Sequence, residues 1–219
     1  MPSTADIAFW ALIAVADLFV AYIFVLWGVA REFRWLTVYF ACRVLASVVE
    51  YVFLWNSGWD SWTYAYVYYI ADAILQVILF ASVGELVLRS ARKSRIARQL
   101  VPLFMAAVFL AAIFSSSIMP LSIIFGTGEN LFWLSAVVVV ASCVWNFFQS
   151  GPQYREWVIA FRLGNVMGLY FVVWAAVAAL RYLTNGENTL GAGYVLAAAA
   201  SVWLPIGSSL AAMSVPQSS

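Results

Sequence analysis

The chain contains no histidine. Histidine is the commonest metal ligand and a usual axial ligand of haem iron, so its absence excludes many metal-dependent and haem-containing membrane proteins. It also removes the side chain that most often serves in general acid–base catalysis, and only carboxylates and tyrosines are left for that work. We therefore expect no metal site and no cofactor, and the composition argues against an enzyme.

Cysteine and lysine are almost absent as well. Cys42 and Cys143 each lie inside an apolar run and form no CxxC motif, so we interpret both as small buried hydrophobic residues. The only lysine, Lys93, lies outside the apolar runs, which excludes a retinal Schiff base inside the membrane. No GxGD motif surrounds Asp17 or Asp72, which argues against an intramembrane aspartyl protease.

Charged residues are also few. Only 10% of the 219 residues are charged, whereas 65% are hydrophobic, and the mean hydropathy is +0.94. Soluble domains contain about 25% charged and about 45 to 50% apolar residues. A chain of this composition needs a lipid bilayer as its partner. A net charge of +1 without a basic helix face argues against binding of nucleic acid.

What the chain does contain is seven apolar runs, each close to the roughly 20 residues that a membrane-spanning helix needs. Glycine, proline and asparagine mark the breaks between runs, and the alternating pattern of a β-barrel is missing. The sequence predicts one all-α domain, residues 1–219, folded as a polytopic seven-helix transmembrane bundle. The predicted helices are Asp6 to Ala30, Trp35 to Trp55, Thr63 to Leu88, Leu100 to Met119, Asn130 to Phe148, Trp157 to Tyr182 and Leu190 to Met213.

The distribution of basic residues predicts the orientation. Most arginines fall in the odd-numbered connections, whereas the even-numbered ones hold Asp60, Glu129 and Glu187 with only Arg181 as a nearby base. Because cytoplasmic loops are enriched in basic residues, we expect the N-terminus outside and the C-terminus in the cytoplasm of a cell (inner) membrane. No basic residue precedes the first run, so we interpret it as a spanning helix rather than a signal peptide. The basic residues of the odd-numbered connections include Arg31, Arg34, Arg89, Arg92, Lys93, Arg95, Arg98 and Arg155.

Ionisable side chains within the apolar runs are candidates for function, because each costs about 2.5 to 3.5 kcal/mol at the centre of a spanning helix. They concentrate on the first three predicted helices. Arg43 and Glu50 lie on nearly the same face of the second helix, too far apart to pair directly, so each is expected to pair with another helix. Glu85 precedes Arg89 by four residues, which favours a local ion pair.

The third predicted helix carries a polar and aromatic stripe at four-residue spacing. Tyrosine rings that lead to a carboxylate could hold a cation, a quinone-like ring or a small polar solute. Alternatively, the tyrosines belong to the interfacial belt and Asp72 pairs with Arg43 to lock the bundle. The candidate ligand-binding residues are Asp17, Arg43, Glu50, Tyr64, Tyr68, Asp72 and Gln76.

Other residues point to helix packing. Gly164 and Gly168 form a small-xxx-small face on the sixth predicted helix, and Asn165 beside them is expected to hydrogen-bond across the contact. Pro205 is expected to kink the seventh helix, because proline frees a backbone carbonyl.

Three segments are similar to a family of uncharacterised seven-helix membrane proteins associated with acidobacterial genomes. They are Arg34 to Tyr39, Tyr69-x-x-Asp72 followed by Gly84 to Arg89, and Gly164-x-x-x-Gly168 continuing to Arg181. Asp72 stands where that family carries a glutamate. The resemblance implies the seven-helix architecture and brings no activity, cofactor or substrate.

The polar residues and Pro205 together favour a carrier or channel for a small solute or ion, with its site on helices one to three. The alternative is a ligand-sensing or accessory subunit of a larger membrane complex, for which another membrane subunit is the expected partner. The outer aromatic stripe and the absence of an extended soluble region favour that alternative.

Overall fold

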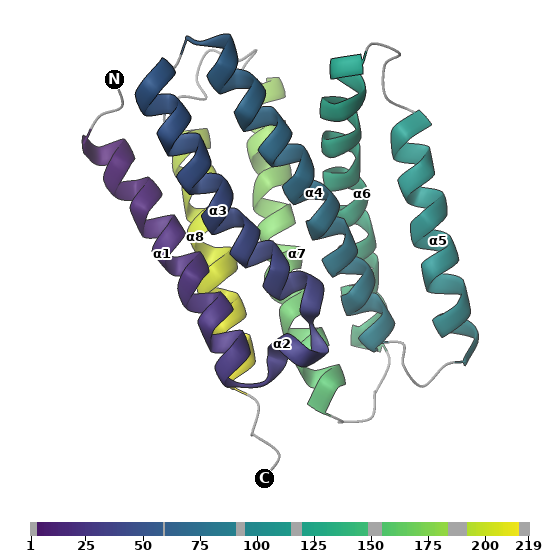
Figure 1. Cartoon of the computed structure of the whole chain (residues 1–219). Coiled ribbons are helices and arrows are strands. Elements are labelled where there is room, and N and C mark those ends of the chain that lie inside the picture. Colours follow the sequence, from purple (N-terminus) through teal and green to yellow (C-terminus); the bar gives the residue numbers. More distant parts are fainter. Residues whose placement is uncertain are drawn as a thin grey trace.

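The computed structural model describes residues 4–58, 60–90, 95–114, 120–148, 155–183 and 192–214. The regular structure in these ranges is helical, with seven long helices and one short helix, α2. The long helices lie side by side and alternate in direction, so α1 begins at the upper end of the bundle and α8 ends at the lower end (Figure 1). The helices are α1 (Thr4–Leu26), α2 (Val29–Glu32), α3 (Arg34–Ser57), α4 (Trp62–Ser90), α5 (Arg95–Phe114), α6 (Pro120–Phe148), α7 (Arg155–Leu183) and α8 (Ala192–Met213).

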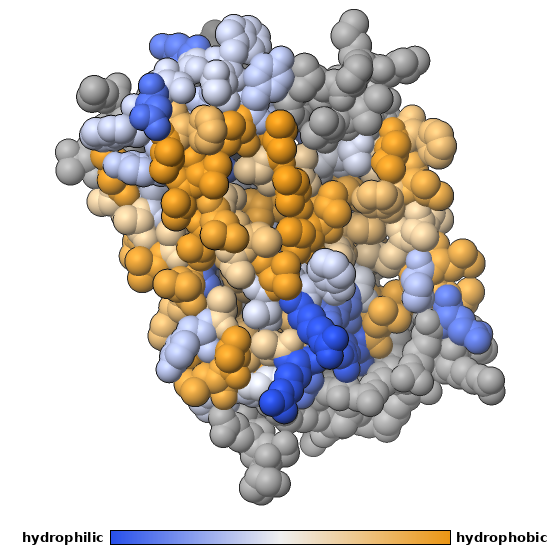
Figure 2. All heavy atoms as spheres, viewed as in Figure 1, coloured by the Kyte–Doolittle hydropathy of each residue, from blue (hydrophilic) through white to orange (hydrophobic). Residues whose placement is uncertain are grey.

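The outer surface of the bundle is apolar. Figure 2 shows a hydrophobic belt between more hydrophilic ends. Large apolar side chains such as Val25 and Leu103 are about two-thirds exposed, which water would not favour but lipid would. Among the described residues, five segments are long and apolar enough to cross a membrane, so the chain is a multi-pass membrane protein. These are Arg34–Ser57, Trp62–Ser90, Gly126–Val144, Trp157–Ala179 and Leu196–Met213, and shorter apolar helices cover Trp10–Leu26 and Gln99–Phe114.

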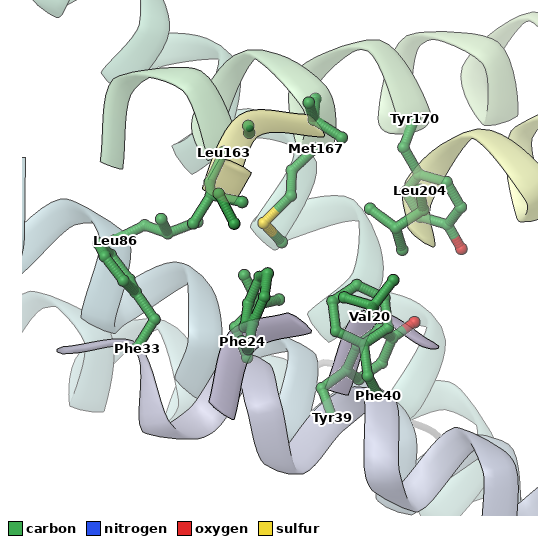
Figure 3. Packing of buried hydrophobic residues seen from close by; sticks show 14 of the residues in the cluster. Val20, Phe24, Phe33, Tyr39, Phe40, Leu86, Leu163, Met167, Tyr170 and Leu204 are labelled. Carbon is green, nitrogen blue, oxygen red and sulfur yellow. The ribbon is translucent and has the colours of Figure 1, made fainter. Parts of the chain in front are cut away.

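The main core joins α1, α3, α4, α7 and α8. Phe24, Phe40, Leu86, Met167 and Leu204 come from these five helices in that order and are all buried (Figure 3). The rings of Phe24 and Phe40 meet edge to face with their centroids 5.9 Å apart. The core therefore ties the first helix of the chain to the last.

Helix α5 lies at the edge of the bundle, where it packs against α4 and α6 (Figure 1). A small separate cluster, which includes Phe80, Met105 and Leu131, holds it there. The structure places this helix at Arg95–Phe114, whereas the sequence predicted Leu100 to Met119. Met119 lies outside the described residues, as do Lys93, Glu187 and the predicted start of the last helix at Leu190.

The first predicted helix is too long at its C-terminal end. Helix α1 stops at Leu26, and Gly28 adopts a left-handed conformation with φ of 70° before the short helix α2 begins. Glycine reaches positive φ without the steric penalty that other residues meet. The apolar run up to Ala30 therefore contains a turn that hydropathy alone does not reveal.

The fifth predicted helix begins too late. The sequence placed Gly126, Thr127 and Gly128 in a connection before Asn130, but α6 is already helical from Pro120. A Cβ atom added to Gly128 would lie 3.3 Å from the Cα of Ala73 on α4. This glycine therefore serves the close contact between α6 and α4 rather than a turn.

Glu85 of α4 caps the N-terminus of α3. Its carboxylate accepts hydrogen bonds from the backbone N–H groups of Arg34 at 3.0 Å and Trp35 at 2.9 Å. The first N–H groups of a helix have no partner within the helix, and a negative charge there is favoured by the helix dipole. The sequence predicted a local pair with Arg89, and Glu85 does interact electrostatically with Arg89, but its hydrogen bonds join α4 to α3.

Glu85→Ala is expected to lower the free energy of unfolding by about 1 to 2 kcal/mol, the usual loss for a capping side chain. Glu85→Gln keeps an oxygen acceptor without the charge and should lose less. Reversible unfolding in mixed micelles measures both variants. An alanine variant as stable as the original chain would show that the cap contributes nothing.

Candidate functional site

A cavity of about 640 Å³ opens between α4, α6 and α7 in the upper half of the bundle. Its volume is in the range of about 300 to 1,000 Å³ that is typical of small-molecule sites. Six of its lining residues are aromatic, two are carboxylates and one is an amide. The lining residues are Tyr68, Tyr69, Asp72, Ala73, Gln76, Gly128, Glu129, Phe132, Trp133, Tyr170, Trp174, Val177 and Ala178.

The polar wall of the cavity comes from α4. Tyr68, Asp72 and Gln76 line it together, because residues four apart share one face of a helix. The side chain of Gln76 donates a hydrogen bond from Nε2 to Oδ1 of Asp72 at 3.2 Å. Its carbonyl oxygen, Oε1, is buried and accepts no hydrogen bond. Tyr64 belongs to the same stripe but is buried outside the cavity lining.

The opposite wall is aromatic and comes from α6 and α7. Phe132 lies edge-on to Tyr170 and Trp174, with ring centroids 6.2 and 6.3 Å away. The indole Nε1 of Trp174 is buried and lies beside Tyr170. The sequence analysis missed this wall, although Tyr170 and Trp174 show the same four-residue spacing that identified the stripe on α4.

The charges at the cavity are negative. Asp72 and the exposed Glu129 line it, and no lysine or arginine lies among the lining residues that the structure describes. Glu50 of α3 lies behind the polar wall, where it is buried and interacts electrostatically with Asp72, Tyr64 and Tyr68. Asp72 therefore lies on the cavity side of this wall, and Glu50 lies on its other side, toward α3.

Arg43 pairs with Asp17 rather than with Asp72. Its Nε lies 3.3 Å from Oδ2 of Asp17, whose side chain is completely buried. The guanidinium also lies over the ring of Tyr39 at 5.7 Å, a distance at which a cation is attracted to an aromatic face. The expectation that Arg43 pairs with another helix is met by α1, and the alternative pairing with Asp72 is wrong.

Five of the seven candidate residues thus divide into two groups. Tyr68, Asp72 and Gln76 line the cavity, whereas Asp17 and Arg43 form an ion pair between α1 and α3. Glu50 and Tyr64 lie between α3 and α4 without lining the cavity. Of the first three predicted helices, only the third, α4, lines the cavity, and it does so together with α6 and α7.

Two tyrosines connect the groups. Tyr170 lines the cavity and is buried in the core, and Tyr39 lies across from it on α3 beside Arg43 (Figure 3). The two tyrosines interact with each other, and both interact with Arg43. A continuous row of polar groups thus runs from the cavity to the buried ion pair.

The predicted packing residues have different surroundings. Added Cβ atoms at Gly164 and Gly168 would each lie 3.6 Å from Sγ of Cys143 on α6, an ordinary contact distance. Asn165 is exposed on the outside of α7 and does not lie in this contact, because its position on the helix turns it away from Gly164 and Gly168. Pro205 is buried within a continuous α8.

The tightest of the glycine contacts between helices was missed by the sequence analysis. A Cβ atom at Gly207 would lie 2.8 Å from Cγ1 of Val166, closer than real Cβ contacts. Gly207 and Ala211 are four residues apart and form a small-xxx-small pair, which is the sequence signal that could have found this contact.

Within the described ranges, no group of three or more cysteine or acidic side chains is arranged to hold a metal ion. No protein family matches the chain, and no curated protein or solved structure is significantly similar to it. The resemblance to the acidobacterial seven-helix family stays a prediction from sequence motifs, and the function must be argued from the cavity.

Proposed function

We propose that this protein is a carrier or channel for a small solute or ion and that the cavity between α4, α6 and α7 is its binding site. The observation that carries the proposal is a ligand-sized cavity containing Asp72 inside an apolar bundle. A carboxylate at this depth lowers the stability of the protein in the membrane, so its presence indicates a function.

The proposal includes seven membrane crossings in a cell (inner) membrane, with the upper end of the bundle outside. Arg31, Arg34 and Arg89 lie at the lower end, and Asp60 lies at the upper end. Basic residues favour the cytoplasmic side. The cavity would then face the outside.

Below the cavity the helices pack tightly. Val83, Val139, Cys143 and Gly164 surround a void of only about 10 Å³ between α4, α6 and α7, too small for a solute. The arrangement supports an outward-facing state. Passage of a solute from the cavity to the lower end of the bundle would require α4 to move relative to α6 and α7. The glycine face of α7 at Gly164 and Gly168 makes such sliding sterically easy.

Asp72→Asn is expected to lower solute uptake by at least about tenfold, because the side chain loses its charge while its size is kept. Proteoliposomes assayed with a broad panel of radiolabelled solutes and with a pH-sensitive dye measure uptake. Asp60→Asn is the matched control, since Asp60 is exposed at the same end of the bundle and does not line the cavity. Transport that is unchanged in Asp72→Asn, or absent for every solute and for protons, would contradict the proposal.

A second candidate is a ligand-sensing or accessory subunit. The closed packing below the cavity favours it, because a receptor binds its ligand without letting it through. This candidate requires a stable partner in the membrane. Purification of the native protein under mild conditions should then recover a second subunit in fixed proportion, and recovery of the isolated chain alone would count against it.

A further inference from the structure

The cavity brings together three kinds of group that favour one chemical class of ligand. Asp72 and Glu129 supply negative charge, and the buried Oε1 of Gln76 is an acceptor without a donor. Phe132, Trp133 and the other rings supply aromatic faces. An acceptor needs an N–H or O–H group, and a carboxylate in an apolar setting needs a cation.

Among the residues that the structure describes, no basic side chain is paired with Asp72. The basic residue in the membrane-crossing part of α3, Arg43, is engaged by Asp17 and Tyr39. Arg162 on α7 bonds to the backbone oxygen of Ser214 at 3.0 Å, at the lower end of the bundle. Glu50 places a further carboxyl group behind Asp72. Among the described residues, the cavity thus has acidic groups without a basic side chain, and a cationic ligand can supply the missing positive charge.

The aromatic wall fits the same ligand. A cation near the face of a tryptophan, tyrosine or phenylalanine ring gains about 0.5 to 2 kcal/mol, and more of this gain is kept where water is excluded. Trp133 and Trp174 offer the strongest faces of this kind, and Tyr68 and Tyr69 stand beside Asp72. A bare metal ion prefers oxygen ligands to aromatic rings, and the cavity offers few oxygen ligands.

We propose that the cavity binds a small organic ammonium ion that carries N–H groups. The ammonium group donates to Asp72 and, when the side chain of Gln76 turns its buried Oε1 toward the cavity, to that oxygen. Its hydrocarbon or aromatic part packs against Phe132, Tyr170 and Trp174. This inference rests on the proposed function and names the class of ligand for the same site. An anion would lie beside two carboxylates with no base among the described lining residues, and a neutral solute would leave the charge of Asp72 unbalanced.

The test is calorimetric titration of the whole chain in lipid nanodiscs with three matched probes: 2-phenylethylammonium, 2-phenylethanol and phenylacetate. They share a phenyl ring and differ in charge. We expect the cation to bind at least about tenfold more tightly than the alcohol, and phenylacetate to bind most weakly. The trimethylated cation should bind less tightly than 2-phenylethylammonium, because it has no N–H group for Gln76.

Asp72→Asn should remove the preference for the cation over the alcohol, whereas Asp60→Asn should keep it. A change in the preference between two probes reports on charge recognition, and a merely structural role would not produce it. If Asp72→Asn does not give folded protein, Glu129→Gln on the opposite wall supplies the same comparison.

The inference is overturned if the alcohol or phenylacetate binds as tightly as the cation, if Asp72→Asn keeps the preference, or if none of the three probes binds. The titration does not depend on transport. Binding of the cation without uptake would keep the ligand class and reject the carrier, and uptake of a neutral solute would keep the carrier and reject the ligand class.

Discussion

Arg43→Met is expected to lower the free energy of unfolding by about 3 to 5 kcal/mol, the usual cost of leaving a buried charge without its partner. Asp17 is completely buried, and Arg43 is its ion-pair partner at 3.3 Å. Methionine fills much of the arginine volume, so the loss would reflect charge rather than an empty space. Unfolding of the purified protein in micelles, followed by circular dichroism, measures the change.

The double variant Asp17→Asn with Arg43→Met should be more stable than Arg43→Met alone. It removes both charges, and replacing a whole buried pair by groups without charge is often nearly neutral. The difference between the double variant and the sum of the single ones isolates the pair. Additive effects would show that the two residues act independently and that the ion pair does not hold α1 to α3.

Gly207→Val is expected to lower the free energy of unfolding by about 1 to 3 kcal/mol or more, as over-packed contacts do. The added Cβ would lie 2.8 Å from Cγ1 and 3.1 Å from Cγ2 of Val166. Valine has few side-chain conformations in a helix, so Val166 cannot turn away easily. The α7 and α8 helices would have to separate, which thermal unfolding in micelles would detect.

Gly168→Ala is the matched control. Its Cβ would lie 3.6 Å from Sγ of Cys143 and 3.7 Å from Cγ1 of Val139, which are ordinary contacts. This variant should keep or slightly raise the stability, since alanine favours a helix more than glycine does. A Gly168→Ala variant that is less stable than Gly207→Val would contradict the conclusion that Gly207 makes the closer contact between helices.

The membrane class and the helical structure could be predicted from the sequence, because hydropathy depends on composition over a whole helix. The breaks were harder to predict. The sequence placed Gly28 in a helix and Gly128 in a connection, but the first forms a left-handed turn and the second lies in a helix against Ala73. What distinguishes them is the neighbouring helix, which the local sequence does not describe.

The polar wall of the site could also be predicted, since spacing along α4 places Tyr68, Asp72 and Gln76 on one face. The helices that face this wall could not be predicted from the sequence. Spacing gives the direction of a side chain relative to its own helix and leaves open which helix it meets. For this reason the partner of Arg43 was left undecided, and the aromatic wall of α6 and α7 was missed.

The cap that Glu85 places on α3 has a consequence for the biogenesis of the protein. The chain is synthesised from its N-terminus, so Arg34 and Trp35 leave the ribosome well before Glu85 does. The N–H groups in the first turn of α3 thus lack this acceptor until the C-terminal part of α4 has been synthesised. The two helices form one hairpin whose insertion is completed jointly, and a nascent chain truncated before residue 85 would carry an α3 with a frayed start.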